Sequence, residues 1–248
     1  IRDLIVTWSS DVCSSDLFAI MEKLGYPWAK NLFHLSYGMV NLPTGKMKSR
    51  EGTVVDADDL FDEMATLATD ACKERGGEEL TEAELKTRGE IIGLGALKFM
   101  LLKFNPKTTI LFDPAASLRF EGDTGPYVQY VAARINSIRR KAAERGLDLD
   151  PAKVDWSLLG HAAEKQLAVT ASFYPAVLRL AAERKDCSGL VEYLLNLGKA
   201  FNSFYRECPV LAAETPALVA ARLALSEAVR QIIVDGLSTL TIRVPDAM

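Results

Sequence analysis

The chain has 248 residues, 49% of them hydrophobic, and a formal net charge of −4 at pH 7. This length and apolar content suffice for one large or two modest cores, and no apolar run approaches the roughly 20 residues that a membrane helix needs. The weak net charge excludes a protein that is basic throughout, so any nucleic-acid partner must meet a local basic surface.

Cysteine and histidine usage narrows the chemistry further. The four cysteines, Cys13, Cys72, Cys187 and Cys208, show neither the close pairs of a zinc site nor the density of a disulfide scaffold. The two histidines, His34 and His161, lie far apart in the sequence. We therefore expect no metal site and a cytoplasmic protein.

Residues 1–17 look foreign to the rest of the chain. Residue 1 is Ile rather than Met, and the string DVCSSDL at residues 11–17 resembles the translated end of a short-read sequencing adapter. We predict that this segment is an adapter artefact and that natural sequence is missing upstream. A genuine Ser-rich loop is the alternative, although no periodicity or cap supports it.

The next elements alternate between helix and strand. Residues 18–24 predict a short apolar helix, and residues 25–27 a turn. The aromatic and apolar residues 34–40 predict a strand, and the β-branched residues 53–55 a brief second one. Asp56, Asp58 and Asp59 then suit the N-terminus of a helix, which we expect to end at Arg75 before two glycines.

Helices dominate the remainder. Thr81 and Glu84 have capping-box spacing, which predicts a long helix ending at Asn105 and Pro106. Residues 108–121 predict a short strand and a loop. From residue 125 to residue 240 the pattern is helical, with apolar residues at three- and four-residue spacing in residues 158–180, 190–205 and 218–240. The change of pattern places a domain boundary near Gly122.

A lysine-rich loop, GKMKSREG, occupies residues 45–52 between the two predicted strands. Gly45 and Gly52 permit unusual backbone angles, and the mobile ammonium groups of Lys46 and Lys48 can follow negative charge that develops on phosphate during adenylate-forming chemistry. An exposed basic hairpin turn is the alternative, and local composition alone favours it.

A second motif begins a helix that carries aromatic and basic residues. The string DTGPYVQY occupies residues 123–130, and the segment from Asp123 to Arg145 inclusive carries five basic and two acidic residues. Helical spacing puts one stripe beside a second, apolar stripe; the first comprises Tyr127, Tyr130, Arg134, Lys141 and Arg145, and the second Val128, Val131, Ile135, Ile138 and Ala142. Aromatic rings beside guanidinium groups stack on unpaired bases. An ordinary surface helix is the alternative.

Both motifs resemble arginyl-tRNA synthetases. The loop at residues 45–52 is similar to the lysine signature loop of class I aminoacyl-tRNA synthetases, and residues 34–59 are similar to the arginine-specific family. Residues 123–130 resemble the start of that family's anticodon-binding domain. The resemblance implies a mainly α fold, in which residues 18–121 end a class I nucleotide-binding, Rossmann-like α/β catalytic domain and residues 122–248 form an all-α anticodon-binding helical bundle.

The resemblance also implies residue roles. Lys46 and Lys48 would be catalytic, with Lys46 the better match because Ser49 stands where the family has its second lysine. The ATP-binding residues would be Lys46, Met47, Lys48, Ser49, His34, Gly38, Met39 and Val40. The tRNA-binding residues would be Tyr127, Tyr130, Arg134, Lys141, Tyr205 and the terminal Met248. The match at residues 244–248 implies that the chain ends naturally.

The implied reaction attaches arginine to its tRNA at the expense of ATP, accompanied by magnesium, in a cytoplasmic monomer without membrane contact. The class I signature with two histidines separated by two residues is missing, so we expect that this chain alone does not activate arginine. Two alternatives remain. One is another class I ligase such as the cysteine enzyme, against which the string at residues 123–127 and the lack of zinc-ligand spacing argue. The other is a stand-alone tRNA-binding helical module without catalysis.

Overall fold

The computed structural model describes residues 10–41, 56–74, 80–147 and 153–248, with residues 10–13 described by their backbone alone. The lysine loop and the predicted strand at residues 53–55 therefore lie outside the described residues. None of the described helices is both long and apolar enough to cross a membrane.

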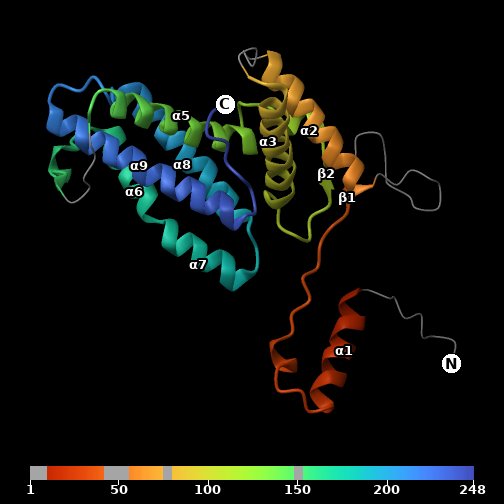
Figure 1. Cartoon of the computed structure of the whole chain (residues 1–248). Coiled ribbons are helices and arrows are strands. Elements are labelled where there is room, and N and C mark those ends of the chain that lie inside the picture. The colour runs from red at the N-terminus through yellow and green to blue at the C-terminus, as the bar shows by residue number, and fades with distance from the viewer. Residues whose placement is uncertain (1–9, 42–55, 75–79, 148–152) are drawn as a thin grey trace, which may run out of the picture.

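The N-terminal arm comprises α1 (Ser10–Lys23), the short 3-10 helix η1 (Ala29–Asn31) and an extended segment that reaches β1 (Val40–Asn41). Figure 1 shows α1 apart from the other helices, joined to them by this extended segment. The predicted helix at residues 18–24 is confirmed, but it begins earlier, at Ser10, within residues 1–17, which we predict to be an adapter artefact. Its Ser- and Asp-rich start suits a first helical turn. The foreign origin of residues 1–17 stays a prediction.

The strand predicted at residues 34–40 is wrong for most of its length. Only Val40 belongs to β1, which pairs in parallel with β2 (Ile110–Leu111) through Val40 opposite Ile110. Residues 32–39 form no strand, although the amide of Gly38 donates to the Pro106 carbonyl at 2.6 Å. A strand depends on its pairing partner as well as on its residue types, and only the end of this segment is paired.

The first pair of packed helices is α2 (Ala57–Glu74) and α3 (Glu82–Leu102). The capping box of α3 is confirmed, because the Glu84 amide donates to Thr81 Oγ1 at 3.3 Å and the Thr81 amide to Glu84 Oε2 at 2.9 Å. The helix ends at Leu102, slightly before the predicted Asn105. A second core, smaller than that of the bundle, forms here from Met64, Ala68, Ile92, Ala96, Leu97, Phe112 and Leu118.

The strand predicted within residues 108–121 is confirmed as β2, but the loop that follows contains a one-turn helix that the sequence did not predict. This helix, α4 (Pro114–Ser117), is capped by Asp113, whose Oδ1 accepts from the Ala116 amide at 3.0 Å.

The helices of the C-terminal bundle are α5 (Gly125–Glu144), α6 (Ala162–Ser172), α7 (Tyr174–Arg184), α8 (Ser188–Glu207) and α9 (Pro216–Thr239), with the 3-10 helix η5 (Trp156–Leu158) before α6. The predicted helical character is confirmed, and the apolar stripe of α5 is buried. The pattern at residues 158–180 divides into two helices, because Pro175 favours a new first turn. The chain is thus mainly α, with a helical bundle following the end of an α/β region.

A buried amide ties the bundle to α3. Gln129 is fully buried on α5, and its side-chain nitrogen donates to the carbonyls of Ile91 in α3 at 3.2 Å and Arg243 in the tail at 2.8 Å. Lys98 of α3 also donates to the Thr241 carbonyl at 2.8 Å. The C-terminal tail therefore returns beside α3 and α5, as Figure 1 shows.

Candidate nucleic-acid interface

The start of α5 is fixed by local capping and by charge. Thr124 Oγ1 accepts from the Tyr127 amide at 3.3 Å, and Pro126 occupies the first turn. Asp123 forms an ion pair with Lys199 of α8 at 2.8 Å. The hydrogen bond from Lys199 holds the pKa of the Asp123 carboxyl below its usual range. These contacts set the position of α5 against α8.

Arg134 lies between two tyrosines from different helices. Its Nη2 donates to the Tyr130 hydroxyl at 2.9 Å, and its Nη1 donates to Asn202 Oδ1 at 3.0 Å. The guanidinium carbon is 4.6 Å from the centroid of the Tyr130 ring and 5.1 Å from that of the Tyr205 ring. Cation–π contact and hydrogen bonds therefore hold one guanidinium and two rings as a unit, which we call the Arg134 cluster (Tyr130, Arg134 and Tyr205).

Tyr127 is linked to this cluster through Asn202. Its side chain is half-buried, and its hydroxyl accepts from Asn202 Nδ2 at 2.8 Å. Asn202 thus links the Tyr127 hydroxyl to the Arg134 guanidinium. Tyr205 remains 41% exposed and stacks on Phe201, with 6.1 Å between the ring centroids. An exposed ring on a rigid support is suited to stacking on an unpaired base.

A cleft of about 410 Å³ opens beside the Arg134 cluster. One side is lined by Arg134, Ser137, Ile138 and Lys141 of α5 and by its C-cap residue Arg145, and the other by Tyr205 and residues 209–212. Residues 209–212 lie between α8 and α9, and we call them the cleft wall. Arg145 Nη1 donates to the Leu211 carbonyl at 3.1 Å, which joins the two sides.

The cleft is positive although the whole chain is acidic. Among the described residues, those that line the cleft include Arg134, Lys141 and Arg145 but no carboxylate. Cys208 immediately precedes the cleft wall and is fully buried, and burial raises the pKa of its thiol. A neutral thiol does not offset the cations. Both the charge and the exposed aromatic ring thus favour an anionic polymer with unpaired bases.

The structure brings together four of the predicted tRNA-binding residues: Tyr130, Arg134, Lys141 and Tyr205. The fifth, Tyr127, is linked to Arg134 through Asn202. Met248 is not among the residues that line the cleft. It packs against the second core, and the preceding Asp246 carbonyl accepts from Asn136 and Arg140 of α5, both at 3.4 Å.

The predicted ATP-binding residues divide into two groups. Lys46, Met47, Lys48 and Ser49 lie outside the described residues. His34, Gly38, Met39 and Val40 lie on the extended segment that runs beside residues 106–112, where the Ile110 amide donates to the Met39 carbonyl at 2.8 Å. In the sequence, the lysine loop falls between β1, which ends at Asn41, and α2, which begins at Ala57.

His34 borders a second cleft, of about 450 Å³, between the extended segment and the turn that joins α7 to α8. Lys185 of that turn lies 4.0 Å from the centroid of the Phe33 ring, and Asn105 Nδ2 donates to Asp186 Oδ2 at 2.9 Å. These contacts join the arm and the loop after α3 to the bundle.

The extended segment also shows a two-residue alternation of burial. Its large apolar side chains are exposed at every second position: Phe33 (53%), Leu35 (57%), Tyr37 (87%) and Met39 (60%). Such a row is typical of a strand whose apolar face packs against another part of the protein.

Sequence reasoning missed Asn202 and the cleft wall. Asn202 lies three residues before Tyr205, so helical spacing puts the two on one face, and this spacing could have identified it. The cleft wall carries no comparable signal, because it contributes mainly apolar side chains and backbone carbonyls.

Two known families match the chain. The DALR anticodon binding domain matches residues 128–248, and the catalytic domain of the class I tRNA synthetases labelled (R) matches residues 4–113. The boundary predicted near Gly122 falls between these two matches.

Individual relatives agree with the family matches. The chain is 44% identical to an arginine–tRNA ligase of Treponema denticola and 42% identical to one of Bacteroides fragilis, over 94% of this chain in each case. It spans only about 40% of the length of these curated relatives.

Among solved structures, arginyl-tRNA synthetase of Thermus thermophilus superposes with a TM-score of 0.81 and 30% identity, over 95% of this chain and 39% of that chain. The arginyl-tRNA synthetase of Plasmodium falciparum shares the fold, with a TM-score of 0.76 at 21% identity, over 94% of this chain and 39% of that one. The chain belongs to the arginyl-tRNA synthetase family, of which it carries the end of the class I catalytic domain and the DALR anticodon-binding domain.

Proposed function

We propose that this chain is part of an arginine–tRNA ligase, in which the bundle binds the anticodon of an arginine-accepting tRNA and the lysine loop serves ATP. The observation that carries the proposal is the Arg134 cluster at the edge of a positive cleft. An unpaired base stacks on Tyr205, and Lys141 and Arg145 approach the neighbouring phosphates. Met248 remains a proposed contact to the same RNA.

The full chain tests the RNA-binding proposal directly. We expect it to bind an arginine-accepting tRNA and to lose affinity by about tenfold or more when the anticodon bases are replaced, because base stacking and base-edge contacts are lost. Fluorescence anisotropy with labelled tRNA measures the dissociation constants for the natural and the anticodon-substituted tRNA. Equal affinity for the two tRNAs would contradict anticodon recognition.

The cations of the cleft make a separate prediction about salt. Replacing Lys141 with Ala should weaken binding of all tRNAs about equally and should lower the slope of log K against log salt concentration by about one. Lys86, a basic residue of the distant groove between α2 and α3, offers the matched control, and Lys86→Ala should leave the slope unchanged. A slope that Lys141→Ala does not alter argues against a phosphate contact there.

For the catalytic part, we propose that Lys46 and Lys48 with Met47 and Ser49 meet the phosphates of ATP, and that His34, Gly38, Met39 and Val40 flank the nucleotide. Magnesium accompanies the ATP phosphates, since it binds nucleotides largely through phosphate oxygens and water. The support is positional, because in the sequence the loop falls between β1, which ends at Asn41, and α2, which begins at Ala57 and packs on α3.

The exposed apolar row at Phe33, Leu35, Tyr37 and Met39 supports a missing partner within the same enzyme. The curated relatives are longer than this chain, and we propose that the rest of the catalytic domain covers this row. The 248-residue chain alone should accordingly show no arginine-dependent exchange of pyrophosphate into ATP. Exchange at the rate of a complete ligase would overturn this expectation.

We propose a cytoplasmic monomer. The four cysteines have neither the density nor the spacing of a disulfide scaffold, which suits a reducing compartment. A class I ligase for cysteine loses support, because the matching catalytic family is the (R) type. A stand-alone tRNA-binding module loses support as well, because residues 4–113 match a catalytic domain.

A further inference from the structure

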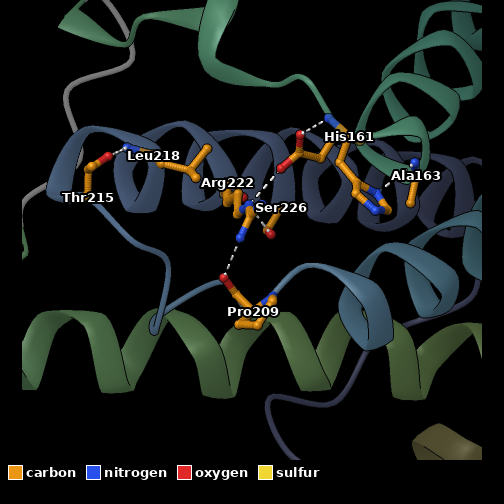
Figure 2. Close-up of polar contacts among 8 residues, drawn as sticks. His161, Ala163, Pro209, Thr215, Leu218, Arg222 and Ser226 are labelled. Carbon is orange, nitrogen blue, oxygen red and sulfur yellow. Dashed lines mark hydrogen bonds and ion pairs between the residues drawn. The ribbon is translucent and has the colours of Figure 1, made fainter.

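A buried ion pair connects three parts of the bundle. Arg222 of α9 donates from Nε to Oε1 of Glu164 in α6 at 2.6 Å, with 12% and 1% of the two side chains exposed. The same guanidinium donates from Nη1 to the Pro209 carbonyl at 2.9 Å. Figure 2 shows Arg222 between His161 on one side and Pro209 on the other.

The geometry of the pair is fully specified. The second carboxylate oxygen of Glu164 accepts from the His161 amide at 2.8 Å, which completes the capping box of α6. On α9, Ser226 Oγ donates to the Arg222 carbonyl at 2.8 Å. The carboxylate is therefore held by α6, and Nε of the guanidinium is engaged by Glu164, while Nη1 donates to the cleft wall.

A buried ion pair of this kind contributes little to the net stability of the fold. Removing two charges from water costs several kcal/mol per ion, and apolar replacements of a buried pair are often neutral or stabilising. The distinctive result of this pair is geometric, because the guanidinium has several donors in a rigid fork. It reaches a carboxylate and the first carbonyl of the cleft wall at the same time.

The Arg222 contact differs from the other contact to the cleft wall. Arg145 reaches the Leu211 carbonyl from the α5 side and is itself exposed. Water and salt screen that contact, and a bound phosphate competes for the same guanidinium. Arg222 is largely buried and contacts Pro209 from the α9 side. The residues before and after Pro209 in the sequence, Cys208 and Val210, are buried as well. It can hold the cleft wall whether or not RNA is present.

We propose that Glu164 and Arg222 are positioning residues for base recognition. They fix the cleft wall opposite the Arg134 cluster, so that the cleft keeps the width that an unpaired base requires. The volume of about 410 Å³ lies in the range of pockets that enclose small organic ligands. This inference rests on the proposed anticodon binding and names the residues that shape its site without touching the RNA.

The first test removes the pair as a unit. The double variant Glu164→Leu with Arg222→Met leaves no unpaired buried charge but removes the capping box of α6, so we expect its thermal midpoint to fall by only about 2–4 °C. Its affinity for a synthetic anticodon stem-loop of arginine-accepting tRNA should fall by about tenfold. The ratio of affinities for the cognate and an anticodon-substituted stem-loop should shrink as well. Partial unfolding lowers the active fraction but does not change that ratio.

A second variant keeps the test decisive if the double variant fails to fold. Arg222→Lys retains a positive charge for Glu164 but lacks the rigid fork, so it should keep the fold and lose the Pro209 contact. The matched control is Ser226→Ala, which removes a buried hydrogen bond beside Arg222 without touching the cleft wall. Ser226→Ala should preserve the affinity ratio.

The outcomes separate the two proposals. A reduced affinity ratio in Arg222→Lys with a normal ratio in Ser226→Ala supports the positioning role. A parent-like ratio in a folded Arg222→Lys or double variant overturns it. If the parent chain itself does not distinguish the two stem-loops, the proposed anticodon binding fails first, and the positioning role fails with it.

Discussion

Replacing Gly93 with Ala should lower the free energy of unfolding of the α2–α3 pair by about 3 kcal/mol, because overpacking a close helix contact forces the backbones apart. A Cβ at residue 93 would collide with the carbonyl group of Met64 and would lie 2.9 Å from the Ala65 nitrogen. These are backbone atoms, so no side-chain rotation relieves the overlap. Met64 is fully buried in the second core, and separating the helices would open that core.

The same substitution at Gly189 provides the matched control. Gly189 lies in the first turn of α8, and a Cβ there would meet nothing within 4 Å. Gly189→Ala should therefore stabilise the chain by about 0.5–1 kcal/mol through helix propensity. Urea unfolding measures both changes, and hydrogen exchange localises the first to α2 and α3. A Gly93→Ala variant as stable as the parent would contradict the close approach of the two helices.

The consequence of Gly93→Ala reaches the proposed ATP loop. Helix α2 begins at Ala57, a few residues after the lysine loop in the sequence, and it is positioned by its packing on α3. If the two helices separate, one anchor of the loop moves. In a complete ligase this change should reduce arginine activation more than tRNA binding, because the Arg134 cluster is built on α5 and α8.

The sequence predicted best those features whose physical cause is local. The capping box of Thr81 and Glu84, Pro126 in the first turn of α5 and the two stripes of α5 each depend on residues within a few turns of one another. The predicted strand at residues 34–40 failed because strand formation depends on a distant partner. Only Val40 meets one, at Ile110.

The candidate site divides in the same way. Helical spacing alone places Tyr130, Arg134 and Lys141 on one side of α5; in the structure Arg134 and Lys141 line the cleft, and Tyr130 contacts Arg134. Spacing could not place Tyr205 against Arg134, because their contact depends on the packing of α8 on α5. Nor could it identify Arg222, since α9 is mostly apolar and the partners Glu164 and Pro209 lie elsewhere in the chain.

The largest effect on RNA binding should come from removing both rings of the Arg134 cluster. Replacing Tyr130 and Tyr205 together with Ala should weaken binding of arginine-accepting tRNA by about 100-fold, since base–aromatic stacking contributes roughly 1–3 kcal/mol per base. The loss of Tyr130 also removes a hydrogen-bond acceptor and a ring from Arg134, which leaves the guanidinium less constrained.

The matched control replaces the same two tyrosines with Phe. This variant keeps both rings and the cation–π contacts but removes the hydroxyls, so its affinity for tRNA should stay within a few-fold of the parent value. Circular dichroism should show folded protein in both variants, because Tyr205 is exposed and Tyr130 is only half-buried. If the Ala pair binds tRNA as tightly as the Phe pair, stacking on this face does not contribute to binding, and the anticodon must meet another surface of the bundle.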